Sequence, residues 1–166
     1  MDVPNIRIEK REKGSRTFEE LALEIKETME GHSYKKELIK RMLKEKSKLR
    51  KTYGVLLNNS PGRIGEFVTK LFMSKNTAYN YLYSLIELGL LKQISIMDIW
   101  NVDNLQGDNK IVMDKFKEWS SKMAKRQMEY FAAKTHYFIL TELGKDIEII
   151  SWVLKLEKEQ KITTPF

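Results

Sequence analysis

Residues 66–91 read EFVTKLFMSKNTAYNYLYSLIELGLL, and two short helical patterns meet within this stretch at Met73 and Ser74. In the second pattern, apolar side chains recur at the spacing of one helix face: Ala78, Tyr81, Leu82, Leu85 and Leu88. Ser74 is a good helix N-cap because its hydroxyl can accept a hydrogen bond from a free backbone N–H. Gly89 can end the second helix, and a β-type run follows at residues 90–96. The stretch therefore predicts two helices joined by a tight turn and followed by a strand.

The outward residues near the start of the second helix are polar, and none of them is acidic: Lys75, Asn76, Tyr79, Asn80 and Tyr83. Side chains in this place can reach base edges when a helix lies in the major groove of DNA. Asn76 and Asn80 can each form paired hydrogen bonds to adenine, and Lys75 can reach guanine. Ser74 and Thr77 are better suited to phosphates. This surface predicts sequence-specific contact with double-stranded DNA.

The pattern resembles the winged helix-turn-helix domain of MarR-, ArsR- and PadR-like transcription regulators. The residues that carry the resemblance are Glu66, Phe67, Val68, Leu71, Met73, Ser74, Thr77, Ala78, Leu82, Leu85, Gly89 and Leu90. Residues 137–145 resemble the end of the second wing strand and the start of the next helix. Phe72 departs from the pattern, because the turn position is usually glycine, and an unusual φ is expected there. The resemblance implies a mainly α fold with a small β-hairpin wing, helical extensions, and a dimeric DNA-binding regulator with helix 75–88 in the major groove.

A second function class stays open, in which a winged helix serves protein interaction, replication or assembly without reading a DNA sequence. An acidic recognition helix would favour it, but no acid precedes Glu87 in the second helix. Catalysis is not expected. The chain has no cysteine, its two histidines, His32 and His136, are far apart, and no phosphate-binding glycine motif or nucleophile motif is present. No enzyme activity, cofactor or metal is therefore predicted.

The positive charge is concentrated in one segment. Residues 33–53 hold nine basic and two acidic residues, which accounts for the whole formal net charge of +7. Lys36, Lys40, Lys44 and Lys48 recur every four residues as a basic stripe, opposite an apolar face formed by Leu38, Met42, Leu49, Tyr53 and Leu56. We expect one long helix reaching about Asn58. The stripe is either a solvated face or a set of phosphate contacts, and its continuity with the DNA-binding helices favours phosphate contacts.

The rest of the chain is organised around this centre. Residues 1–16 are expected to be a flexible charged N-terminus, and residues 17–46 a helical extension that opens with a capping box at Thr17–Glu20 and continues through Ile25 and Met29 to Gly31. Ser33 can cap the basic helix. Residues 47–145 form the winged domain, and residues 146–166 a C-terminal helix. The chain has no run of about 18 apolar residues and no apolar signal core, so a cytoplasmic protein without membrane contact is expected.

Residues 98–134 interrupt the predicted wing as an insertion. Apolar residues at helical spacing predict a helix of about 20 residues there: Val112, Phe116, Trp119, Met123 and Tyr130. The stripe is either a packing face or a partner surface. The cations Lys115, Lys122, Lys125 and Arg126 are available to phosphates in the second interpretation.

Thr141 is expected to cap a last helix over residues 142–160. Its apolar residues Leu143, Ile147, Ile150 and Leu154 follow a 4-3-4 spacing that suits a helix–helix seam. These four residues are the predicted interface of a two-fold homodimer.

Overall fold

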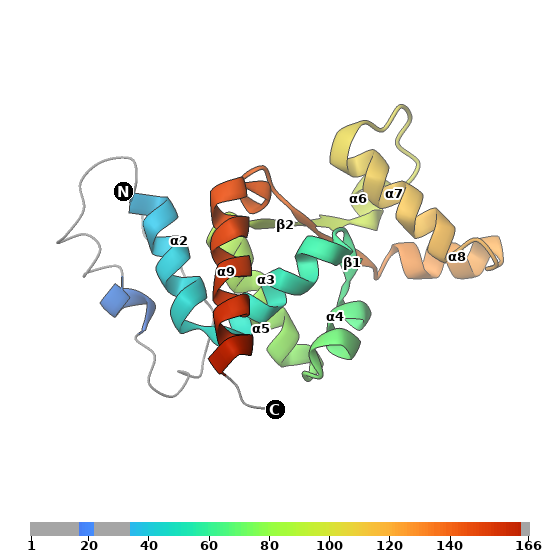
Figure 1. Cartoon of the computed structure of the whole chain (residues 1–166). Coiled ribbons are helices and arrows are strands. Elements are labelled where there is room, and N and C mark those ends of the chain that lie inside the picture. The colour runs from blue at the N-terminus through green and yellow to red at the C-terminus, as the bar shows by residue number, and fades with distance from the viewer. Residues whose placement is uncertain (1–16, 22–33, 164–166) are drawn as a thin grey trace.

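The computed structural model describes residues 17–21 and 34–163, and over them the chain is mainly helical with a small three-stranded antiparallel sheet (Figure 1). The coarse fold class predicted from the sequence is thus confirmed. At the N-terminal side, the backbone N–H of Glu20 donates to Thr17 Oγ1 at 3.2 Å, so one half of the predicted capping box is present. The expectations for residues 1–16, for Ile25 and Met29, and for the Ser33 cap lie outside the described residues.

The expected single basic helix is wrong, because it breaks at Lys46 into α2 (Tyr34–Glu45) and α3 (Ser47–Asn59). Lys46 has φ −103° and ψ 85°, outside the helical region. Arg50 Nη1 donates to the carbonyls of Leu43 and Lys44, both at 3.0 Å. These carbonyls belong to the last turn of α2, where the helix itself supplies no donor. Arg50 therefore stabilises the end of α2 at this point.

The two helices of the central stretch are confirmed as α4 (Ile64–Leu71) and α5 (Lys75–Glu87). Ser74 caps α5 by accepting from the backbone N–H of Thr77 at 3.2 Å. The five apolar residues predicted for one face of α5 are all buried: Ala78, Tyr81, Leu82, Leu85 and Leu88. Before α4, strand β1 covers Gly62–Arg63, and Glu66 accepts the backbone N–H of Arg63 at 2.6 Å. That cap starts α4 at Ile64.

The sheet has the order β1-β3-β2, with β2 at Leu91–Ser95 and β3 at His136–Leu140. β2 and β3 pair antiparallel from Leu91 opposite Leu140 to Ser95 opposite His136. Between them, residues 96–135 form a helical insertion of α6 (Ile96–Ile99), α7 (Gly107–Trp119) and α8 (Lys125–Ala132).

The expected 20-residue helix of this insertion is therefore wrong, since α7 and α8 are separate. α7 ends at Ser120, which has φ −94° and ψ 7° and whose buried hydroxyl donates to the carbonyl of Phe116 at 2.8 Å. The helical insertion has its own core: Ile96, Ile99, Val112, Met113, Phe116, Ala132, Tyr137 and Ile139.

The C-terminal helix also begins later than expected. A 3-10 turn, η1 (Leu143–Lys145), precedes α9 (Ile147–Thr163). Thr141 Oγ1 accepts the N–H of Gly144 at 3.0 Å, so Thr141 caps the turn and not the helix. Asp146 Oδ1 accepts the N–H groups of Glu148 and Ile149 at 3.0 and 3.2 Å and caps α9.

The main core joins α2, α3, α5, α9 and the sheet, and α2 and α9 lie side by side (Figure 1). The five apolar residues predicted opposite the basic stripe are all buried in it: Leu38, Met42, Leu49, Tyr53 and Leu56. Within the described ranges, no helix combines the length and the apolar character needed to cross a membrane.

Candidate nucleic-acid interface

The first turn of α5 is the most accessible polar surface that the sequence singled out. Ser74, Lys75 and Asn76 are exposed, while Thr77 and Asn80 are half-buried. The Ser74 hydroxyl donates to Thr77 Oγ1 at 2.9 Å, so both hydroxyls are already engaged in the helix cap. Among the described residues, the side chains of Lys75, Asn76 and Asn80 have neither a hydrogen-bond nor an ion-pair partner. The structure thus leaves one ammonium and two amides free at the same end of α5.

Tyr79 and Tyr83 are half-buried and do not project freely from α5, and their contact with DNA stays a prediction. Their rings stack at 5.6 Å between centroids, with 16° between planes. Both rings also contact Phe138 of β3 edge-on, at 6.1 and 6.5 Å. Burial raises the pKa of Tyr79, with a further contribution from Tyr83. The tyrosine pair therefore supports α5 against the sheet.

Phe72 lies at the turn between α4 and α5, where the resembled pattern has glycine, and its backbone has the unusual φ that was expected there. Its φ is +53° and its ψ +44°, the left-handed conformation. The side chain is 95% exposed, so it adds nothing to the core.

The predicted basic stripe does not form one continuous cationic face. Lys36 Nζ lies 3.0 Å from Asp146 and 3.5 Å from Glu148, and Lys40 Nζ lies 3.7 Å from Glu148. The hydrogen bond to Asp146 is the main reason that the pKa of Lys36 is raised. Lys44 remains exposed on α2, while Lys48 lies beyond the break, on α3. The charges of Lys36 and Lys40 thus face acids near the start of α9, and phosphate contact by these two lysines stays a prediction.

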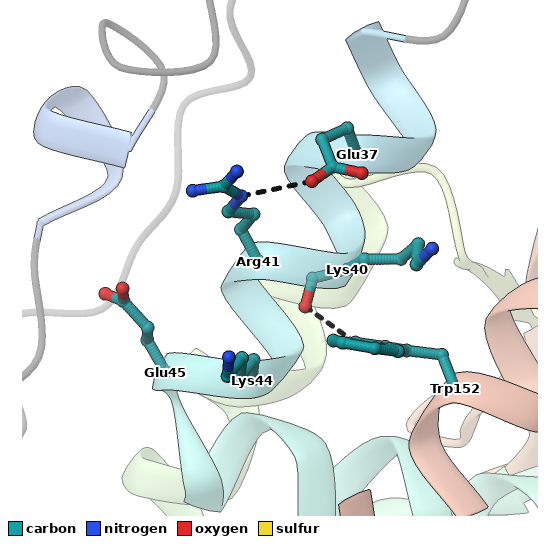
Figure 2. Close-up of a pocket in the computed structure, with 6 residues that line it drawn as sticks. All are labelled: Glu37, Lys40, Arg41, Lys44, Glu45 and Trp152. Atoms are coloured by element: carbon teal, nitrogen blue, oxygen red, sulfur yellow. Dashed lines mark hydrogen bonds and ion pairs between the residues drawn. The ribbon is translucent and has the colours of Figure 1, made fainter. Parts of the chain in front are cut away.

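A hollow of about 350 Å³ lies beside this α2–α9 contact, shown in Figure 2. It is lined by Glu37, Lys40, Arg41, Lys44, Glu45 and Trp152. Trp152 reaches from α9 and donates its indole N–H to the carbonyl of Lys40 at 2.9 Å, and Arg41 Nε donates to Glu37 at 3.1 Å (Figure 2). Three cations and two carboxylates line the hollow, so it presents charges of both signs to a ligand.

The predicted dimer seam on the C-terminal helix is split between two faces. Leu143 and Ile150 are half-buried and pack against the chain's own core. Ile147 and Leu154 are 79% and 59% exposed, respectively. Ile149, Val153 and Leu156 form the inward face of α9. The outward apolar surface of α9 thus centres on Ile147 and Leu154.

Arg50 and Asp146 are structural charges that the sequence reasoning missed. Arg50 is 6% exposed, and besides the α2 carbonyls it donates to Glu157 at 2.8 Å and to Gln160 at 2.9 Å. No local sequence pattern around Arg50 predicts these hydrogen bonds. For Asp146 a signal existed, because an aspartate directly before an apolar helical pattern is a common N-cap.

In the described part of the chain, histidine, aspartate and glutamate side chains form no group suited to a metal ion. Comparison of the chain with models of protein families, with curated proteins and with solved structures found no match to any of them.

Proposed function

We propose that the chain is a winged helix-turn-helix protein that binds double-stranded DNA and regulates transcription as a homodimer. The element order supports this fold: α3, a short β1, α4 and α5, then the paired strands β2 and β3. In this proposal β2 and β3 are the wing strands, and the helical insertion takes the place of the usual short wing tip. A cytoplasmic location goes with this role.

The observation that carries the proposal is the free polar end of α5. Lys75, Asn76 and Asn80 have no partner within the described residues, and no acid precedes Glu87 on this helix. A bidentate contact of such a side chain with a base edge contributes about 1–3 kcal/mol of discrimination. The cap at Ser74 and the tyrosine pair on Phe138 fix the direction in which this end points.

Selection of bound genomic DNA fragments, followed by sequencing, tests the proposal. The wild-type chain should enrich a common sequence. The variant Lys75→Ala with Asn76→Ala and Asn80→Ala should lose that enrichment while keeping its helical circular dichroism. Lys155→Ala with Lys158→Ala, two exposed cations on α9, is the matched control and should keep the sequence preference. A triple variant with unchanged preference would contradict the assignment to α5.

The dimer is tested at the outward face of α9. Because Ile147 and Leu154 are 79% and 59% exposed, Ile147→Glu with Leu154→Glu should fold and sediment as a monomer with weakened DNA binding. Val102 and Ile111 are 51% and 50% exposed on the helical insertion, so the same change there is the matched control. A wild-type chain that sediments as a monomer at tens of micromolar, with and without DNA, would rule the dimer out.

Phe72 is the observation that favours the second function class, a winged helix that binds another protein. Its side chain is 95% exposed beside the start of α5, and an apolar ring in water is a typical contact in protein interfaces. A photo-crosslinking phenylalanine analogue at position 72 separates the two classes in cells. DNA adducts support the regulator, and adducts with a protein other than the chain itself support the scaffold.

A further inference from the structure

Three cations stand close together at the turn between α7 and α8: Lys122, Lys125 and Arg126. All three are exposed, and no acid occurs between Ser120 and Met128. The three have no ion-pair or hydrogen-bond partner in the part of the chain that the structure describes. Lys115, the fourth cation expected to face phosphates, is different, because its ammonium donates to the carbonyl of Pro61. We call Lys122, Lys125 and Arg126 the turn cluster.

The backbone that carries the turn cluster is well held. The N–H of Met123 donates to the carbonyl of Ser120 at 2.9 Å, and that of Met128 donates to the carbonyl of Ala124 at 2.9 Å. Ser120 itself is fully buried. The acids nearest in sequence are Glu118, before the turn, and Glu129, on α8.

The helical insertion is also tied to the rest of the fold. The guanidinium of Arg63, in β1, lies 4.2 Å from the ring centroid of Trp119 in α7. Lys92 of β2 pairs with Asp108 of α7 at 2.6 Å. Tyr137 and Ile139 of β3 contribute to the core of the insertion. Phe138, between them in the same strand, supports the tyrosine pair of α5. β3 thus packs against the core of the helical insertion on one face and against the tyrosine pair of α5 on the other.

We propose that the turn cluster is a second DNA contact that binds backbone phosphates beside the bases reached by α5. The inference rests on the proposed function. Clustered cations neutralise phosphates and release counterions, which gives affinity without sequence preference. Arg126 can hold a phosphate with two parallel hydrogen bonds, and the hydrogen-bonded turn reduces the ordering cost of binding. An acidic protein surface would also attract cations, but three exposed cations with no acid between Ser120 and Met128 match the uniform negative charge of a phosphate backbone.

The test is the salt dependence of binding to a DNA site selected by the wild-type chain. In the variant Lys122→Gln with Lys125→Gln and Arg126→Gln, the slope of log affinity against log salt should flatten by up to about 2.7, at about 0.9 per lost phosphate contact. The sequence preference should stay unchanged. Lys145→Gln with Lys155→Gln and Lys158→Gln removes the same formal charge from η1 and α9, and it should leave the slope near the wild-type value.

Hydroxyl-radical footprinting supplies an independent readout. The turn-cluster variant should lose protection of the backbone beside the α5 contact while keeping protection at that contact. An unchanged slope and footprint in this variant, or equal flattening in the control variant, would overturn the inference and leave the proposed function standing. A wild-type chain that binds no DNA would overturn both.

Discussion

Replacing Arg50 by methionine is expected to destabilise the fold by about 2–4 kcal/mol, a loss that follows from its hydrogen bonds. The side chain is 7% exposed and donates to two backbone carbonyls of α2 and to two side chains of α9. A hydrogen bond from a charged donor contributes about 1.5–3 kcal/mol, and the buried carbonyl of Leu43 finds no replacement donor on methionine. Glu157 is 32% exposed, so water can replace part of the hydrogen bonding that its carboxylate loses in the variant. The carbonyls therefore account for most of the expected cost.

Urea denaturation followed by circular dichroism measures this loss, and the midpoint of thermal unfolding should fall by roughly 5–15 °C for a chain of this size. Lys51→Met is the matched control, since Lys51 is the exposed neighbour of Arg50 on α3, and it should shift stability by less than about 0.5 kcal/mol. Arg50→Lys should recover only part of the loss, because an ammonium cannot serve acceptors on two helices as a guanidinium does. An Arg50→Met variant within about 1 kcal/mol of wild type would refute the role given to this side chain.

Three further outcomes follow from single contacts. Phe72→Gly should stabilise the fold by about 0.5–1 kcal/mol, because glycine takes a positive φ without the cost that a side chain pays; a lower urea midpoint would contradict this. Tyr53→Phe should cost about 1–2 kcal/mol, since the buried hydroxyl donates to the carbonyl of Gly144 at 2.6 Å; an unchanged midpoint would count against it. The hydrogen bond from Lys36 lowers the pKa of Asp146 below its usual 3.8. The stability that this pair contributes is therefore complete above pH 3.8 and is lost as the pH falls through the lowered pKa of the folded state. Asp146→Asn should therefore flatten the acid limb of a plot of stability against pH, whereas an acid limb as steep as that of wild type would refute the pairing.

The features that the sequence predicted correctly are those set by residues close together in the chain. The buried face of α5 follows from the spacing of its apolar residues, and Ser74 caps the helix as its hydroxyl suggested. Gly89 has φ +84°, which suits its predicted place at the end of the helix. β3 begins at His136, within a residue of the position expected from the pattern. Each of these features depends on residues that are close together in the chain.

The break between α2 and α3 was not predictable in the same way. No glycine or proline marks Lys46, and the apolar spacing continues through it. The groups that stabilise the break include Glu157 and Gln160, which are more than 100 residues away from Arg50. The ion pairs of Lys36 and Lys40 were unpredictable for a related reason, because Asp146 and Glu148 come from a distant part of the sequence.

The four residues of the predicted dimer seam do not all lie in one helix. Leu143 lies in the 3-10 turn before α9, so the spacing from Leu143 to Ile147 is not an α-helical one. Within α9 proper, Ile149, Val153 and Leu156 face the core, while Ile147 and Leu154 face outward. The spacing alone could not separate these faces, since both follow a helical repeat.

Part of the positive charge of residues 33–53 is neutralised by ion pairs within the fold. The sequence concentrates its net charge in residues 33–53, but α9 supplies acids to Lys36 and Lys40 there. In the part of the chain that the structure describes, exposed cations without a hydrogen-bond or ion-pair partner also stand at the start of α5 and at the turn between α7 and α8. Figure 1 shows α7 and α8 at the right of the view and α9 left of centre, beside α2. The outward face of α9 is the proposed dimer surface.

This arrangement has a consequence for the shape of the proposed complex. In the proposed homodimer, a two-fold axis beside Ile147 and Leu154 brings the α9 helices of two copies together, and we propose that each helical insertion lies at an outer end. If the two α5 helices read half-sites about one turn of DNA apart, roughly 34 Å, the turn clusters meet phosphates outside those half-sites. The DNA between the half-sites then carries no contact from the insertions. Shortening a selected site from its ends should therefore weaken binding to the wild-type chain more than to the turn-cluster variant, whereas equal losses would place the clusters elsewhere.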